Sequence, residues 1–156
     1  YDFKILKAVE EVNEAQKLHL IPKIEKYFKG DVKGKHFALW GLAFKPNTDD
    51  IREAPALYLI DALTAAGATV TAYDPEAMPN VKNTIGDKIK YADSQYGALK
   101  NADALVIATE WSEFRTPDFE VIDSLLKGKA IFDGRNLFEV KYITDMGYHY
   151  ESIGRH

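Results

Sequence analysis

The sequence has 156 residues, 46% of them hydrophobic and 28% charged, with a formal net charge of −4 and no cysteine. This length suits one domain with a substantial core, the charge argues against a nucleic-acid partner, and the lack of cysteine excludes disulfides and thiolate metal sites. Because no apolar run approaches the roughly 20 residues that span a bilayer and the start does not resemble a signal peptide, we expect a cytoplasmic protein with no membrane partner.

The first predicted element is a helix over residues 2–19. Its apolar residues recur at steps of three or four, the spacing of one helix face: Ile5, Val9, Val12, Ala15 and Leu18. Pro22 is expected to end or kink this helix, because proline disrupts a helix interior, and an apolar stripe continues to Phe28. Residues 30–35 are polar and contain two glycines, so we interpret them as a linker.

From residue 36 onward, predicted strands and helices alternate. The expected strands cover residues 36–42, 68–73, 88–92, 104–108, 130–132 and 148–152, and the expected helices cover 55–66, 94–100, 118–126 and 140–146. Pro55 suits the first position of a helix, and Gly67 is the expected stop of the same helix. This alternation predicts an α/β fold: a doubly wound, mainly parallel, Rossmann-like sheet of about six strands, preceded by an N-terminal helix.

The loop after the first strand is the most informative segment of the chain. Residues 41–55 read GLAFKPNTDDIREAP, and in a parallel sheet ligands bind beyond the carboxyl ends of the strands. Lys45 and Arg52 there offer charge-assisted donors that suit a phosphate. A solvated polar loop would carry the same charges, so charge alone leaves both interpretations open.

The glycine-rich turn of dinucleotide-binding folds is absent after this strand, where the chain reads GLAFK. Side chains and other loops must therefore hold any phosphate. We expect Lys45 and Arg135 to come from neighbouring strand ends of the common doubly wound order, so that both could contact it.

Other polar residues at predicted strand ends have two interpretations. Asp74 lies where a dinucleotide fold places a carboxylate for ribose, yet an Asp-Pro pair more simply begins a turn. Asp49 and Asp50 balance the basic residues of their loop more simply than they bind a metal, and we expect no metal site. Trp111 could stack on a base or pack at a domain interface.

Several motifs, in the same order along the chain, resemble one protein family. The segment 41–55 resembles the UDP-binding domain of the UDP-glucose/GDP-mannose dehydrogenase family. Further similar strings are AYDP at residues 72–75, ATEW at 108–111 followed by Glu113 and Phe114, and FDGRN at 132–136. Within the family, the TEW-x-EF string most resembles the UDP-glucose 6-dehydrogenases. The resemblance covers residues 36–153.

The resemblance implies the UDP-sugar-binding domain of an NAD-dependent enzyme that oxidises UDP-glucose to UDP-glucuronate in two steps at C6, with two NAD. Phe44 and Lys45 would contact the UDP-sugar, and Arg135 would contact its phosphate or sugar side. Arg52 would reach the NAD cofactor. UDP-N-acetylmannosamine and GDP-mannose 6-dehydrogenases remain alternatives, as does a stand-alone nucleotide-binding module.

The resemblance also implies that the chain is a piece of a longer enzyme. The family's catalytic cysteine lies upstream of this domain, so we expect no catalytic residue here and an inactive fragment. Residues 1–29 would end the central linking helical segment, and residues 30–156 would form the UDP-sugar domain. NAD would be bound mainly by the N-terminal domain of the same chain, in a homodimer that serves polysaccharide biosynthesis.

Overall fold

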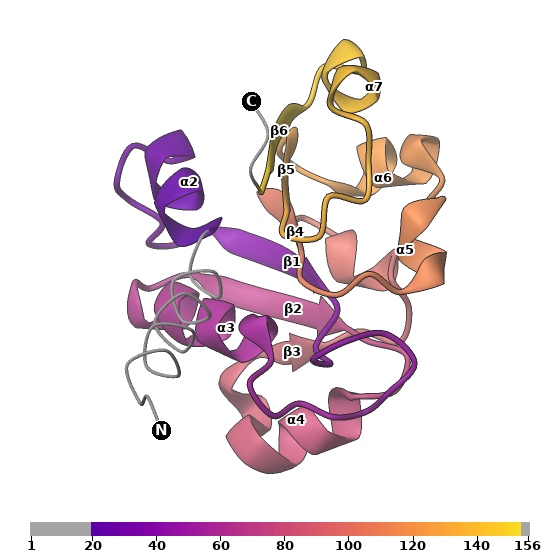
Figure 1. Cartoon of the computed structure of the whole chain (residues 1–156). Coiled ribbons are helices and arrows are strands. Elements are labelled where there is room, and N and C mark those ends of the chain that lie inside the picture. Colours follow the sequence, from indigo (N-terminus) through magenta and orange to yellow (C-terminus); the bar gives the residue numbers. More distant parts are fainter. Residues whose placement is uncertain (1–19, 154–156) are drawn as a thin grey trace, which may run out of the picture.

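The computed structural model describes residues 20–153, and the helix predicted over residues 2–19 lies outside this range. Its six strands form one sheet in the order β3-β2-β1-β4-β5-β6, and every pair is parallel (Figure 1). The strands are β1 (His36–Trp40), β2 (Thr69–Tyr73), β3 (Lys90–Tyr91), β4 (Ala104–Ile107), β5 (Ala130–Asp133) and β6 (His149–Ser152). The prediction of a doubly wound, parallel α/β fold is confirmed.

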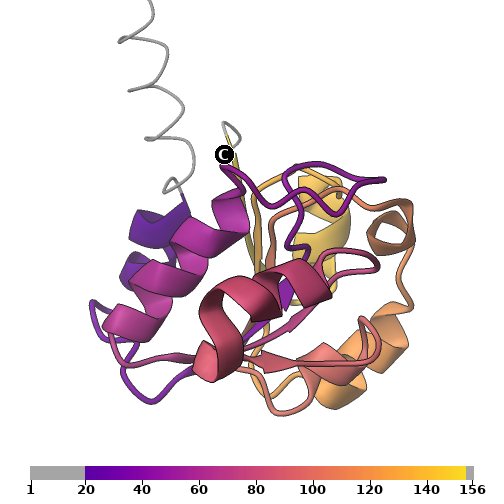
Figure 2. The same cartoon turned by 90° about the horizontal axis from the view of Figure 1, so that it is seen from below.

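Helices cover both faces of the sheet (Figures 1 and 2). One face carries α2 (Leu20–Tyr27), α3 (Pro55–Ala65) and α4 (Met78–Ile85), and the other carries α5 (Ser112–Arg115), α6 (Phe119–Leu125) and α7 (Val140–Asp145). Short 3-10 turns lie at Gly86–Lys88 (η1) and Gly97–Leu99 (η2). Within residues 20–153, no helix has the length and apolar character needed to cross a membrane.

The central strands are buried because both faces are covered. All residues of β4 and β5 are buried, which explains why both sequences, apart from Asp133 at the end of β5, are apolar runs rather than alternating ones. On one face Trp40 of β1 stacks on Phe114 of α5 with ring centroids 5.1 Å apart. On the other, Tyr27 of α2 contacts Phe132 of β5 edge-on, with centroids 5.9 Å apart. The apolar stripe around Tyr27 therefore packs on this sheet.

Most predicted elements are confirmed with small changes in their ends, but two helices were missed and two predictions differ from the structure. The helix α4 was missed, because MPNVKNTI contains a proline and two asparagines, which favour turns over helices. The single-turn helix α5 was also missed. The helix expected over residues 94–100 is only the turn η2. Pro22, which was expected to end or kink the first helix, lies inside the described helix α2, so it does not end a helix there.

Candidate functional site

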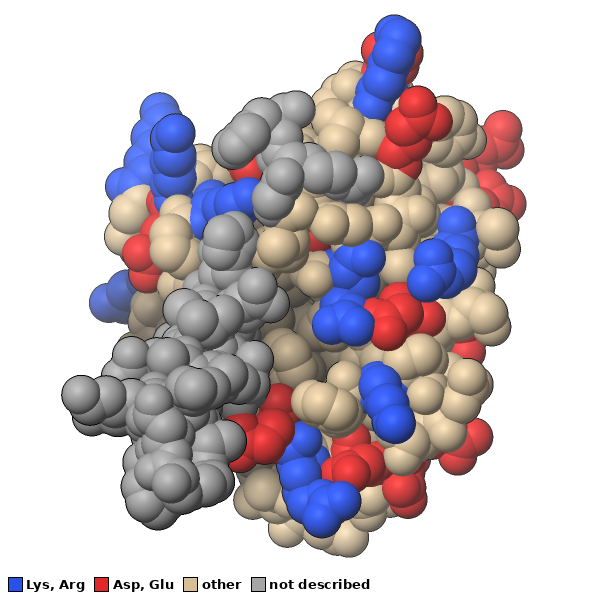
Figure 3. Space-filling model, in the orientation of Figure 1, with Lys and Arg blue, Asp and Glu red and all other residues tan. Residues whose placement is uncertain are grey.

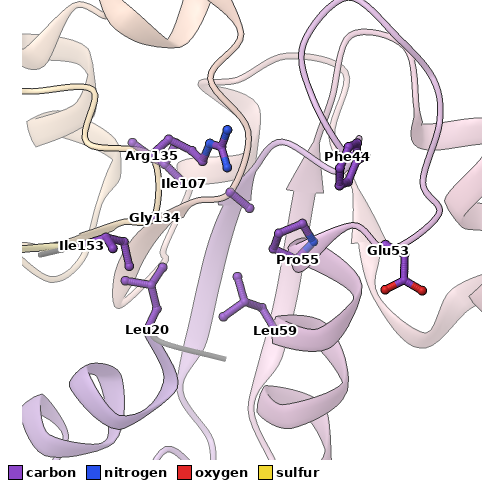
Figure 4. A pocket seen from close by; sticks show the side chains of 10 residues that line it. Leu20, Phe44, Glu53, Pro55, Leu59, Ile107, Gly134, Arg135 and Ile153 are labelled. Carbon is purple, nitrogen blue, oxygen red and sulfur yellow. The ribbon is translucent and has the colours of Figure 1, made fainter. Parts of the chain in front are cut away.

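A cavity of about 380 Å³ lies at the carboxyl ends of β1, β4 and β5 (Figure 4). The chain leaves β1 toward β2 on one side of the sheet, while β4 and β5 extend the other side, so this is the topological switch point where α/β proteins bind ligands. The cavity is lined by Leu20, Phe44, Glu53, Pro55, Leu59, Ile107, Ala108, Gly134, Arg135 and Ile153. The crevice therefore lies where the sequence predicted it.

Phe44 and Arg135 approach this cavity from opposite sides. The guanidinium of Arg135 extends over the cavity toward the side on which Phe44 stands (Figure 4). Phe44 is 46% exposed, which is unusual for a large apolar side chain and leaves its ring available for stacking. Between them the floor is apolar, with Leu59 and Ile107. A ligand with both a planar group and a negative charge fits this arrangement.

The positive end of α3 also borders the cavity. Pro55 is at the start of the helix, and no side chain caps its N-terminus. The start of a helix is the positive end of its dipole, which favours an anion, although in α3 Pro55 has no N–H and the N–H of Leu57 already donates to the Ala54 carbonyl at 3.2 Å. Arg135 and this helix end therefore give the cavity two positive features.

Arg135 is held by its backbone and by its side chain. Its backbone N–H donates to the carboxylate of Asp133 at 2.9 Å, and its Nε donates to the carboxylate of Glu110. Asp133 is fully buried and also accepts from the hydroxyl of Tyr150 and the N–H of Leu137, each at 2.7 Å. The loop after β5 is thus fixed by a buried carboxylate. Sequence reasoning missed the role of Glu110, which only the adjacency of β4 and β5 reveals.

The loop after β1 is fixed in the same way by Asp74. This carboxylate is fully buried and accepts from the N–H groups of Leu42 and Ala43 at 2.7 and 3.0 Å. Its other oxygen accepts from the N–H groups of Glu76 and Ala77, both at 2.8 Å. Asp74 therefore begins a turn, as one interpretation held, and the alternative of ribose binding is wrong because these contacts occupy a buried side chain.

Trp111 completes this arrangement. Its indole Nε1–H donates to Asp74 at 3.0 Å, and the residue is only 7% exposed. The ring belongs to the core of this domain, which argues against base stacking, whereas its packing at an interface with another domain stays a prediction. Next to it, Thr109 donates to the carbonyl of Ala43 at 2.7 Å. The loops after β1, β2 and β4 are therefore bonded to one another.

Gly41 shows how closely the loops after β1 and β4 approach. Its φ is +98°, and a Cβ atom placed there would lie 2.5 Å from the Cβ of Thr109. Such a contact is impossible without moving the backbone, so only glycine fits. Here the glycine serves the packing of two loops.

Lys45 and Arg52 lie outside the cavity lining. We expected Lys45 and Arg135 on neighbouring strand ends, which was wrong in detail, because β4 lies between β1 and β5. Lys45 is exposed on its loop. The Arg52 side chain is 87% exposed, and its Nη2 pairs with Asp50 at 2.9 Å. The hydrogen bond from Arg52 lowers the pKa of Asp50 to about 2.

Asp49 and Asp50 contribute to loop structure. The side-chain amide of Asn80 donates to the Asp49 carbonyl at 2.9 Å, and Asp50 accepts from the N–H and guanidinium of Arg52. No group of three potential metal ligands occurs among residues 20–153. Figure 3 shows acidic and basic side chains interspersed over the visible face of the described residues. This face therefore carries no large area of a single charge sign among the described residues.

A family model and several relatives match the chain. The model of the UDP-glucose/GDP-mannose dehydrogenase family, UDP binding domain, matches residues 38–140. The UDP-glucose 6-dehydrogenase TuaD of Bacillus subtilis is 43% identical over 155 residues, which is 99% of this chain and 33% of that protein. The UDP-glucose 6-dehydrogenase of Pseudomonas aeruginosa is 44% identical over 160 residues, 99% of this chain and 35% of that protein.

Solved structures of nucleotide-sugar dehydrogenases share the fold of this chain. A UDP-glucose dehydrogenase from Pyrobaculum islandicum gives a TM-score of 0.77 at 33% identity, covering 93% of this chain and 31% of that one. A UDP-D-ManNAc dehydrogenase from Pyrococcus horikoshii gives 0.74 at 27% identity, covering 99% and 34%. The chain thus spans about one third of the length of the curated relatives it matches.

Proposed function

The chain belongs to the UDP-glucose/GDP-mannose dehydrogenase family, and from this we propose that it is the UDP-sugar-binding domain of a UDP-glucose 6-dehydrogenase. The observation that carries the proposal is the cavity at the switch point, where Phe44 and Arg135 face each other. One side chain can stack on a planar group, and the other can pair with a phosphate. A nucleotide sugar offers both.

In this proposal each residue has a defined role toward UDP-glucose. Arg135, together with the N-terminus of α3, holds the diphosphate, because both present positive charge to the cavity. Phe44 contacts the nucleotide sugar with its exposed ring. Lys45 follows Phe44 on the exposed loop and reaches the ligand from the rim.

The proposed reaction of the whole enzyme oxidises the C6 alcohol of UDP-glucose to a carboxylate, giving UDP-glucuronate. NAD supplies the hydride acceptor, twice for each substrate, and a cysteine elsewhere in the longer protein supplies the nucleophile. This chain contains no cysteine. Its residues bind and orient the substrate, which alone supplies a large part of a rate enhancement. We also propose that the whole enzyme is a cytoplasmic homodimer and that its product serves polysaccharide biosynthesis.

The described residues do not fit NAD at the strand end that dinucleotide folds use. The N–H groups of Leu42 and Ala43 already donate to Asp74, and Thr109 fills the space beside Gly41. We propose instead that NAD is held mainly by another domain and that the exposed Arg52 contacts it from the rim. The 87% exposure of the Arg52 side chain supports a role toward a group outside this domain.

Titration of ligands into the 156-residue chain tests the proposal. UDP and UDP-glucose should shift the amide signals of Phe44 and Arg135 with a Kd near the ~1 mM that half a site would give, and NAD should bind more weakly. UDP-N-acetylmannosamine and GDP-mannose are included because one similar structure is a UDP-D-ManNAc dehydrogenase. Tight NAD binding with shifts centred on Gly41 and Asp74 would contradict the proposal.

The same titration compares the alternative functions. Stronger binding of UDP-N-acetylmannosamine or GDP-mannose than of UDP-glucose would favour one of the other dehydrogenases. A stand-alone nucleotide-binding module would bind UDP tightly without any partner domain, because its site would then be complete in this chain. Weak binding with a preference for UDP-glucose is the result that we expect.

A further inference from the structure

We propose that Glu110 is a positioning residue that orients Arg135 for the phosphate of the nucleotide sugar, an inference that rests on the function proposed above. The observation behind it is the contact between the Nε of Arg135 and the carboxylate of Glu110. Glu110 does not line the cavity, whereas Arg135 does. Any effect of Glu110 on the phosphate therefore passes through Arg135.

Both partners of this pair have fixed backbones. Glu110 follows β4 and Arg135 follows β5, and these strands pair in parallel up to Ile107 and Asp133. The buried Asp133 accepts the Arg135 N–H at 2.9 Å, and Thr109, the residue before Glu110, donates to the Ala43 carbonyl in the loop after β1. The side chain of Arg135 is 36% exposed, and that of Glu110 is 22% exposed. Because hydrogen bonds hold the backbone beside both partners, this pair is more restrained than an ion pair between two free surface side chains.

The contact also leaves the useful edge of the guanidinium available. Glu110 occupies the Nε–H donor, whereas the two terminal amino groups lie over the cavity (Figure 4). A guanidinium has five N–H donors, so four remain, and its terminal amino groups can fork onto two phosphate oxygens. An arginine that is already held loses less side-chain freedom when the ligand binds, which improves affinity.

A competing effect of opposite sign makes this proposal testable. The Glu110 carboxylate is negative and lies beside the group that is proposed to bind a phosphate. If its charge alone mattered, removing it would reduce repulsion and strengthen the binding of UDP-glucose. If its orienting contact matters more, removing it weakens binding. The direction of the change therefore separates the two effects.

The experiment compares the variants Glu110→Ala and Glu110→Gln in the 156-residue chain, with UDP-glucose titrated by amide chemical shifts. We expect Glu110→Ala to raise the Kd about two- to tenfold, the effect of one unrestrained flexible side chain. Glu110→Gln keeps a carbonyl acceptor for the Nε–H and should recover part of the loss. The matched control is Glu113→Gln, which makes the same charge change at a residue whose carboxylate accepts from Tyr73 instead of Arg135, and it should leave Kd unchanged.

Arg135→Ala and the double variant separate this inference from the function on which it rests. If Arg135→Ala leaves UDP-glucose binding unchanged, the proposed site and the role of Glu110 both fail. If Arg135→Ala weakens binding but Glu110→Ala leaves it unchanged or strengthens it, only the positioning role is overturned. In the Arg135→Ala background, Glu110→Ala should have no further effect, because there is nothing left to orient.

Discussion

At the scale of single residues, two buried aspartates fix the loops that border the cavity without lining it themselves. Asp74 follows β2 and Asp133 ends β5, and each accepts backbone N–H groups of the turn that follows. Each also accepts one aromatic side-chain donor, from Trp111 and Tyr150 respectively. A short carboxylate can satisfy several donors at once, so one residue fixes each loop.

Asp74→Asn should destabilise the fold. The substitution keeps the size of the side chain but replaces an acceptor oxygen by an N–H₂ donor, which then faces other buried donors. Since hydrogen bonds to a charged group contribute about 1.5–3 kcal/mol each, we expect the free energy of unfolding to fall by about 2–3 kcal/mol. Urea denaturation followed by circular dichroism measures this. Asp93→Asn, an exposed aspartate, is the control, and an equal loss there would contradict the role of Asp74.

Arg52→Ala tests the assignment of this residue to the cofactor. In the proposed full-length dehydrogenase it should raise KM for NAD about tenfold, the value of one charge-assisted contact of about 1.5 kcal/mol, and change KM for UDP-glucose little. If the guanidinium makes a bidentate contact, Arg52→Lys should recover little of the lost affinity for NAD. A change confined to the KM of UDP-glucose would show that Arg52 serves the substrate.

At the scale of elements, β1 is held to β2 at the amino-terminal ends of the two strands, opposite the cavity. The ring of His36, the first residue of β1, bonds to the hydroxyls of Thr69 and Thr71 at 2.7 and 3.0 Å. Burial, with a further contribution from the charge of Lys90, lowers the pKa of His36. The folded state therefore favours the neutral ring.

This shift makes stability depend on pH in a known direction. A lowered pKa means that the unfolded chain binds more protons below its own value of about 6.5, so this contribution is complete above that pH and is lost as the pH falls toward the folded value. We expect urea midpoints to fall between pH 7.5 and pH 5.5, and His36→Gln to reduce that slope. His149→Gln is the control, and an equal reduction there would show that the slope has another origin.

At the scale of the whole molecule, the strands could be predicted more reliably than their surroundings. Apolar runs such as Ala104–Ile107 identify strands that are covered on both faces, and Pro55 identified the start of α3. The composition of α4 hid that helix, because its formation depends on packing through residues such as Val81 more than on its own propensity.

The site was predicted only in part, for a related reason. The position of the crevice follows from the parallel sheet, and Phe44 and Arg135 do line it. The contact of Arg135 with Glu110 could not be predicted, because it depends on which strands are neighbours in the sheet. The same holds for Trp111, whose buried donor meets a carboxylate from a distant strand. Contacts between loops require the sheet order, which local patterns do not contain.

The bonded loops after β1, β2 and β4 limit how this domain could acquire another ligand. A glycine-rich turn grafted after β1 would need the N–H groups that Asp74 now binds and the space that Thr109 now fills. Replacing Asp74 first would leave buried donors unpaired, including the indole of Trp111, and replacing Thr109 first would remove the donor that the Ala43 carbonyl accepts. Redesign into a dinucleotide binder therefore has to change all three loops together, and stepwise evolution along that route would pass through weakly folded intermediates.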